Sequence, residues 1–258
     1  MATLYLIGLG IADYRGLSLE AIEILKKTKT VFIENYTNFI EEETIKKIEK
    51  MVDKKLIVLG REEVENEKII LEQLKKRDCS MIVAGDPLIA TTHISLVLSC
   101  KKHNHEVKII HNSSILSAAI AESGLQVYKF GKTCSIPYWR ENYKPVSFLE
   151  VIETNNKIQA HTLCLLDIDK ELGPMSVKRA LNIIFEAQKE IKKQILDLES
   201  KVIILSNLGR KNQQIWAGKI KEFLDKKEDV DGPAVLIIPS TMHFVEEEYF
   251  RYLEKNNF

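Results

Sequence analysis

The stretch CSMIVAGDPLIATTH, residues 79–93, decides most about the fold of this chain. An apolar run from Met81 to Ala84 ends at Gly85, Asp86 and Pro87, and two threonines and a histidine open the next periodic segment. This order predicts a buried strand, a glycine turn and then a helix. Because ligands bind at the carboxyl ends of strands in open α/β sheets, the turn is a candidate binding site.

Apolar runs of the same kind alternate with helical patterns through the first half of the chain. Such strands, apolar throughout and separated by helices, predict a parallel sheet covered on both faces. The expected strands are Thr3–Leu9, Thr30–Glu34, Leu56–Leu59, Met81–Ala84 and Val107–Ile110. The expected helices are Ser18–Lys27 with Leu19, Ile22 and Leu25 on one side, Ile40–Met51, Arg61–Lys76 with Val64, Ile69, Leu71 and Leu74 buried, and Ile94–Lys101.

The pattern changes after His111. A small-residue helix is expected over Ser113–Ser123, and Pro174 is expected to be the first residue of a long helix that ends near Leu198. Short strands follow in quick succession near the end of the chain, which favours a mixed sheet. We therefore expect an α/β protein with two α/β domains: residues 1–112 with a mainly parallel sheet and residues 113–258 with a mixed sheet.

Composition bounds the class of protein. The chain has 258 residues, and its 37 basic and 37 acidic residues cancel, so no global electrostatic attraction to nucleic acid is expected. No apolar run approaches the length that spans a membrane, and the first residues show no signal-peptide pattern. The four cysteines are scattered and mostly lie in or beside apolar runs, as in reducing compartments. We expect a cytoplasmic protein that binds neither membrane nor nucleic acid directly.

Several motifs admit more than one interpretation. Gly8 and Gly10 begin a dinucleotide fingerprint, but Asp13 stands where the third glycine belongs. Three interpretations of these glycines stay open. They could form a nicotinamide site in which Glu34 binds the ribose, a simple tight turn, or a site for a different adenosine cofactor. The sequence GKT at 131–133 lacks the earlier glycine of a phosphate loop and is rejected.

No metal is expected. The residues that suggest one are Cys100, His103, His105 and His111, and their spacing is too loose for a tetrahedral site. His93 and His161 are interpreted as structural histidines with satisfied hydrogen bonds. No residue stands out as a general base.

Asp86 has a sharper interpretation. Its carboxylate is suited to ribose hydroxyls or to the positive groups of a ligand, although it could instead cap the following helix. Ser114 and Ile115 open a helix whose free N–H groups suit a carboxylate. Tyr138 and Trp139 lie in an aromatic-rich stretch and are the rings expected to border a cationic substrate.

Four stretches in order resemble the diphthine synthases, and the resemblance covers nearly the whole chain. They are LYLIGLG at 4–10, REEVE at 61–65, GDPLIATTH at 85–93 and YKFG at 128–131, with HNSSI at 111–115 and HTLCLLDI at 161–168 around them. A lone GDP tripeptide would carry little weight, whereas the ordered set is specific.

This resemblance implies a tetrapyrrole-methylase-like fold, usually a homodimer, with S-adenosyl-L-methionine in the cleft between the two domains and S-adenosyl-L-homocysteine as product. It implies methylation of the modified histidine of translation elongation factor 2 in diphthamide biosynthesis. The positions that match the cofactor-binding residues of the family are Ile11, Asp86, Ile89, Ser114, Ile115, Leu165, Leu208 and Ala234.

The chain departs from the family at three places. Many relatives have histidine where Ala234 aligns, Ala12 replaces a glycine, and the segment 167–176 is shorter than in many eukaryotic relatives. Three alternatives stay open: a small-molecule methylase acting on a tetrapyrrole, a nicotinamide-dependent oxidoreductase, and a cofactor-binding partner protein without catalysis.

Overall fold

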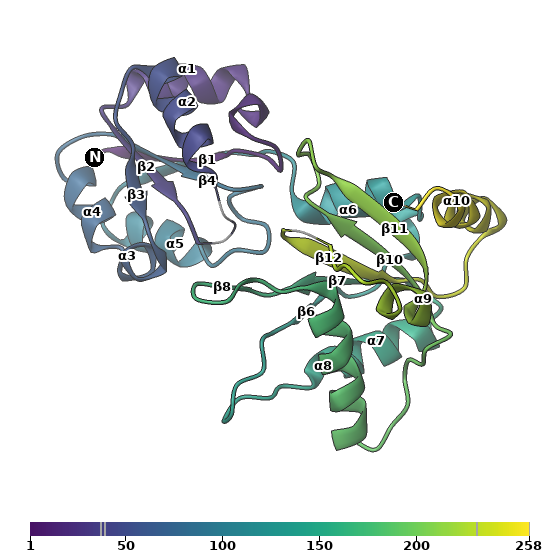
Figure 1. The fold of residues 1–258 in the computed structure, drawn as a ribbon. Helices are drawn as coiled ribbons and strands as arrows, with labels where there is room; N and C mark the ends of the chain where they lie inside the picture. Colours follow the sequence, from purple (N-terminus) through teal and green to yellow (C-terminus); the bar gives the residue numbers. More distant parts are fainter. Residues whose placement is uncertain (37, 39, 231, 258) are drawn as a thin grey trace. The chain divides into compact units, whose positions relative to one another are not determined.

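The computed structural model describes residues 1–36, 38, 40–230 and 232–257. The chain divides into two compact units, Met1–Ile115 and Leu116–Phe258, each with its own sheet (Figure 1). Among the described residues, no helix combines the length and the apolar character that crossing a bilayer requires.

The first unit is built on a five-stranded sheet in which every strand pairing is parallel. The strand order is β3-β2-β4-β1-β5. The strands are β1 (Thr3–Gly8), β2 (Thr30–Glu34), β3 (Ile57–Leu59), β4 (Cys79–Val83) and β5 (Glu106–Ile110). Because both faces are covered, the central strands carry apolar side chains on both sides, which produces the continuous apolar runs in the sequence.

Helices cover the two faces of this sheet. They are α1 (Leu19–Lys27), α2 (Glu42–Val52), α3 (Arg61–Asn66), α4 (Lys68–Leu74) and α5 (Ile94–Lys102), with a short 3-10 helix η1 (Tyr14–Gly16). Residues of α1 and α2 pack with Ile7, Ile33 and Ile82, while residues of α3, α4 and α5 pack with Leu6 and Met81. Alternate strand residues therefore face two separate cores.

This topology creates a switch point between β1 and β4. The connection from β1 runs across one face to β2, and the connection from β4 runs across the opposite face to β5. Right-handed crossovers in opposite directions place their helices on opposite faces, so the connections that follow β1 and β4 lead away to opposite faces of the sheet. Ligands of open α/β sheets bind at such a point. We call this end of the sheet, where β1, β4 and β5 terminate, the carboxyl edge.

Two expectations about the helices of the first unit are wrong. The helix predicted over Arg61–Lys76 is two helices, because the backbone of Glu67 is left-handed with φ of 63°. The interruption rotates the second helix, so that Ile70 is fully buried and Ile69 is exposed. In α1 the buried stripe is Ala21 and Leu25, and Leu19, its first residue, is 82% exposed.

The second unit has a five-stranded mixed sheet, in the order β11-β10-β12-β7-β6. Only the pairing of β6 with β7 is parallel among the strands described. The strands are β6 (Cys134–Ile136), β7 (Thr162–Leu166), β10 (Lys201–Ser206), β11 (Gln214–Lys219) and β12 (Ala234–Ile238), and a small hairpin adds β8 (Ile168–Asp169) and β9 (Gly173–Pro174).

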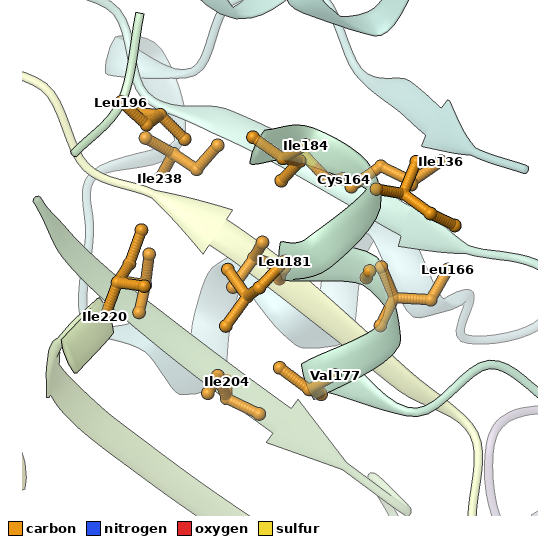
Figure 2. Packing of buried hydrophobic residues seen from close by; sticks show 14 of the residues in the cluster. Ile136, Cys164, Leu166, Val177, Leu181, Ile184, Leu196, Ile204, Ile220 and Ile238 are labelled. Carbon is orange, nitrogen blue, oxygen red and sulfur yellow. The ribbon is translucent and has the colours of Figure 1, made fainter. Parts of the chain in front are cut away.

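One long helix supplies six buried residues to the core of the second unit: Val177, Ala180, Leu181, Ile183, Ile184 and Ala187. Figure 2 shows α8 (Val177–Glu190) laying Val177, Leu181 and Ile184 over the sheet, where they meet residues such as Cys164 and Ile204. The other helices are α6 (Ile115–Ser123), η2 (Val127–Lys129), α7 (Ser147–Lys157), α9 (Ile220–Leu224) and α10 (Phe244–Lys255).

The predicted start and end of the long helix are both wrong. Pro174 pairs with Ile168 in the β8–β9 hairpin, and the helix begins only after Ser176, whose hydroxyl accepts a hydrogen bond from the backbone N–H of Arg179. The helix ends at Glu190 and not near Leu198. There the side chain of Gln188 accepts the backbone N–H groups of Ile195 and Leu196, which holds the chain in a turn.

Candidate functional site

The turns that leave β1 and β4 are joined directly through their backbones. The N–H of Gly10 donates to the carbonyl of Gly85 at 3.1 Å, and the N–H of Gly85 donates to the carbonyl of Gly10 at 2.9 Å. Both residues have positive φ, 79° and 73°, which favours glycine. A Cβ on Gly8 would lie 2.7 Å from the Gly85 carbonyl oxygen. Glycine is therefore required for this close approach.

Asn112, which follows β5, ties a third segment to the same place. Its side-chain amide donates to the carbonyl oxygens of Gly8 at 2.8 Å and Gly16 at 2.9 Å. Its backbone N–H donates to a carboxylate oxygen of Asp86 at 3.2 Å. The segments after β1, β4 and β5 are thus one hydrogen-bonded assembly at the carboxyl edge.

Asp86 lies at the centre of this assembly and is only 4% exposed. One carboxylate oxygen accepts from Leu88 N at 3.0 Å, and the other accepts from His111 Nδ1 at 2.8 Å and from Asn112 N. Burial raises the pKa of this carboxyl, but the hydrogen bonds from Leu88, His111 and Asn112 outweigh burial and hold the pKa below its ordinary value. The alternative role as a cap of the next helix is wrong, since α5 begins only at Ile94.

His111 is the residue at the carboxyl edge that sequence analysis missed as a partner of Asp86. Its side chain is 70% exposed, while the carboxylate that it contacts is buried. The two residues are 25 positions apart, and only the parallel sheet brings the ends of their strands to one edge. The signal available beforehand was that each residue lies one or two positions after an expected buried strand.

The other predicted cofactor positions of the first unit occupy the same edge. Ile11 follows the β1 turn and is half-buried, and Ile89 follows the β4 turn and is exposed. Ser114 is buried and leads into Ile115, the first residue of α6. The Cα of Ser114 lies 4.0 Å from the point where a Cβ on Gly85 would be.

The remaining three predicted positions lie together in the second unit. Ala234 pairs with Ser206 across β12 and β10, and its neighbour Val235 pairs with Leu165 across β12 and β7. Leu208 follows the end of β10 and is buried, as is Ala234. Leu165, Leu208 and Ala234 therefore share one end of the second sheet.

His93 has a structural role. It is almost fully buried; its Nδ1 lies 2.9 Å from the carbonyl oxygen of Pro87, and its Nε2 lies 3.4 Å from the hydroxyl of Tyr36. Since a carbonyl only accepts, Nδ1 carries the proton. The hydroxyl of Thr91 donates to the same carbonyl at 2.7 Å. These contacts fix the loop between β4 and α5.

The residues considered for a metal have other surroundings. His103 lies at the end of α5, where its Nδ1 is 2.8 Å from the carbonyl oxygen of Ser99. Cys100 is buried, and burial raises the pKa of its thiol to about 11, which disfavours the thiolate that binds metals. Within the described residues no group of three or more His, Cys, Asp or Glu side chains is arranged to hold an ion.

The aromatic stretch after β6 is held by polar contacts. The backbone N–H of Tyr138 donates to Asp167 at 2.9 Å, and the indole of Trp139 donates to the carbonyl of Pro145 at 3.1 Å. Both rings are partly buried against the core of the second unit. Both residues follow β6, which lies beside β7 in parallel register.

Comparison with known proteins defines the class first. Residues 3–224 match the family model of the Tetrapyrrole (Corrin/Porphyrin) Methylases, and the chain belongs to this class. Within it, the chain is a member of the diphthine synthase family. It is 37% identical over 256 residues to the diphthine synthase of Methanococcus vannielii, covering 98% of this chain and 99% of that protein. The identity to the diphthine synthase of Methanocaldococcus jannaschii is also 37%, over 258 residues, with 98% and 99% covered.

Solved structures agree. A protein of Entamoeba histolytica proposed to be a diphthine synthase superposes with a TM-score of 0.89 at 32% identity, with 98% of both chains covered. A second solved structure, of a diphthine synthase, has a TM-score of 0.86 at 25% identity and covers 98% of this chain and 96% of its own. The α/β fold of the tetrapyrrole methylase type that the sequence predicts is confirmed.

Proposed function

We propose that this protein is an S-adenosylmethionine-dependent methyltransferase that methylates the modified histidine of translation elongation factor 2 in diphthamide biosynthesis. The observation that supports it best is the 37% identity to diphthine synthases over 98% of the chain, together with the methylase family model. The alternative of a small-molecule tetrapyrrole methylase is not favoured, because the relatives that match over the full length are diphthine synthases.

The residues at the carboxyl edge fit such a cofactor. Asp86 keeps its carboxyl ionised, which suits a ligand with a sulfonium and an ammonium group. The glycine turns at Gly10 and Gly85 allow a ligand to approach the backbone. The start of α6, a nine-residue helix, offers N–H groups to a carboxylate.

Eight residues would hold the cofactor, largely through backbone groups. Five belong to the first unit and three to the end of the second sheet: Ile11, Asp86, Ile89, Ser114, Ile115, Leu165, Leu208 and Ala234. The domains would be residues 1–112 and 113–258, with the cofactor in the cleft between them. The enzyme would act as a cytoplasmic homodimer, without direct contact to nucleic acid or membrane. Membership in the diphthine synthase family supports each of these points.

The chemistry divides between cofactor and protein. The sulfonium, when bound, supplies an electrophilic methyl group. The chain must orient the acceptor amine in line with the breaking bond, and orientation of this kind lowers a barrier by roughly 7–11 kcal/mol in favourable cases. It must also exclude water and accept the proton that the amine releases. Tyr138 and Trp139 would border the acceptor, where aromatic faces favour a methylated ammonium.

Mass spectrometry tests the proposal directly. Elongation factor 2 that carries the unmethylated precursor is incubated with the protein and isotope-labelled S-adenosylmethionine. The expected result is a mass increase of one or more labelled methyl groups on the modified histidine. No labelled methyl group on the factor contradicts the proposed function.

A second measurement addresses the substrate side. Tyr138→Leu and Trp139→Leu should weaken binding of the elongation factor or lower its turnover, whereas Tyr252→Leu, an exposed position on α10, should leave both unchanged. Unchanged binding and turnover in both ring variants would remove these residues from the proposed site.

A further inference from the structure

Asp86 and His111 form a carboxylate–imidazole pair at the carboxyl edge. Asp86 follows β4 and His111 directly follows β5, and His111 Nδ1 lies 2.8 Å from Asp86 Oδ2. The carboxylate is fixed by two backbone N–H groups, from Leu88 and Asn112. The imidazole is therefore held by a group that cannot itself turn away.

The pair also sets which nitrogen of His111 carries the proton. An ionised carboxylate only accepts hydrogen bonds, so Nδ1 donates, and in the neutral ring Nε2 keeps its lone pair. The His111 side chain is 70% exposed, and its Nε2 has no hydrogen-bond partner among the described residues. A buried carboxylate behind an open imidazole nitrogen is the arrangement that prepares histidine to accept a proton.

The other histidines with buried partners differ in this respect. Both ring nitrogens of His93 face partners within the protein, the carbonyl of Pro87 and the hydroxyl of Tyr36. His161 is fully buried, with both nitrogens engaged. The exposed His103 has a backbone carbonyl and not a carboxylate behind its Nδ1.

We propose that His111, oriented by Asp86, is a catalytic residue that accepts the proton of the amine during methyl transfer. This inference rests on the proposed function. The amine lone pair forms the new N–C bond, the C–S bond breaks with its electron pair remaining on sulfur, and the proton of the amine passes to His111 Nε2. The resulting imidazolium is stabilised by the Asp86 carboxylate and then releases its proton to water.

The first experiment needs neither cofactor nor turnover. Diethyl pyrocarbonate acylates unprotonated, accessible imidazole nitrogens, and peptide mass spectrometry of the full-length protein locates the adducts. We expect His111 to be modified and precursor-carrying elongation factor 2 to protect it severalfold, while His103 is modified equally with and without the factor. Failure of the factor to protect His111 overturns the inference.

The second experiment measures catalysis and binding together. His111→Ala should lower kcat by about 10²–10⁴-fold, while calorimetry with S-adenosyl-L-homocysteine gives an affinity within about twofold of the wild type, because the lost group acts on the proton and not on the cofactor. Added imidazole should restore part of kcat to His111→Ala. The matched variant His103→Ala should have wild-type kcat with and without imidazole.

The outcomes separate the two proposals. Wild-type kcat in His111→Ala overturns the inference and leaves the proposed function intact. Loss of both kcat and S-adenosyl-L-homocysteine affinity without rescue by imidazole also overturns it, since His111 would then act in binding. A wild-type protein that binds the cofactor product and transfers no methyl group overturns the proposed function itself.

Discussion

Among the residues that the structure describes, a carboxylate–histidine pair occurs in each of the two units. In the first unit, Asp86 and His111 are 2.8 Å apart, and in the second unit, Glu246 and His161 are 3.3 Å apart. Both carboxylates are at most 4% exposed. For both, burial raises the pKa, and hydrogen bonds more than compensate, lowering the pKa of Glu246 to about 2. Each pair thus joins a buried carboxylate to an imidazole, but the His111 side chain is 70% exposed and the His161 side chain is fully buried.

The two pairs differ in whether the second ring nitrogen of the histidine has a hydrogen-bond partner. His161 Nδ1 accepts the backbone N–H of Ser240 at 2.9 Å, so its Nε2 carries the proton that faces Glu246. Lys129 Nζ donates to the same carboxylate at 2.7 Å. Both ring nitrogens of His161 have hydrogen-bond partners, whereas Nε2 of His111 faces solvent. A carboxylate–histidine pair therefore becomes structural when every polar atom has a partner, and available for chemistry when one nitrogen is left to solvent.

The largest expected effect of this difference is on stability. Glu246→Gln should lower the free energy of unfolding by about 3–5 kcal/mol, because it removes one partner of a buried charged network. Urea unfolding followed by circular dichroism measures the change. Glu247→Gln is the matched control on the same helix, with its ion pairs to Lys201 and Arg251 exposed, and should change stability by less than about 1 kcal/mol. Equal effects of the two variants would contradict the structural role of Glu246.

The second prediction concerns pH. The pKa of Glu246 falls from 4.5 to about 2, so its stabilising contribution is present above pH 4.5 and is lost as pH falls through about 2. Burial lowers the pKa of His161, so the unfolded chain binds that proton first, and stability also falls as pH drops below 6.5, the ordinary pKa of histidine. The unfolding free energy measured between pH 7 and pH 2 should decline steadily, and the decline should be smaller in Glu246→Gln. Identical declines would argue against this assignment.

The third prediction tests the open pair through ligand binding. Asp86→Ala should weaken S-adenosylmethionine binding about tenfold or more, since it leaves the N–H groups of Leu88 and Asn112 without their acceptor and loosens the assembly at the carboxyl edge. Titration calorimetry measures the affinity. Glu43→Ala, exposed on α2, serves as the control. Wild-type affinity in Asp86→Ala would count against the placement of the cofactor.

The smallest expected effect is again on stability, at His111. His111→Gln should change the free energy of unfolding by no more than about 0.5 kcal/mol, because the side chain is mostly exposed. His161→Gln should cost about 1–3 kcal/mol, since it disturbs buried donors and acceptors. Thermal melts of the two variants in parallel provide the comparison, and similar losses in both would mean that the two pairs are alike after all.

The elements predicted from sequence agree best with the structure where burial requires apolar side chains on one or both faces of an element. The predicted strand Thr30–Glu34 coincides with β2. The agreement is poorest where a single residue changes the backbone direction. Glu67 adopts a left-handed conformation without being glycine, so no propensity marks the break between α3 and α4. Pro174 has the propensity of a helix start, but hairpin pairing and the Ser176 cap override it.

The same division holds at the candidate site. The sequence by itself determined the parallel α/β pattern and the glycine turn at Gly85 with Asp86 directly after it, because strand burial and turn geometry are local properties. Only the tertiary structure decided that His111 is the hydrogen-bond partner of Asp86 and that Glu246 is the hydrogen-bond partner of His161. Hydrogen bonds between residues 25 and 85 positions apart depend on which strand ends share an edge, and strand order is not written in any local stretch of sequence.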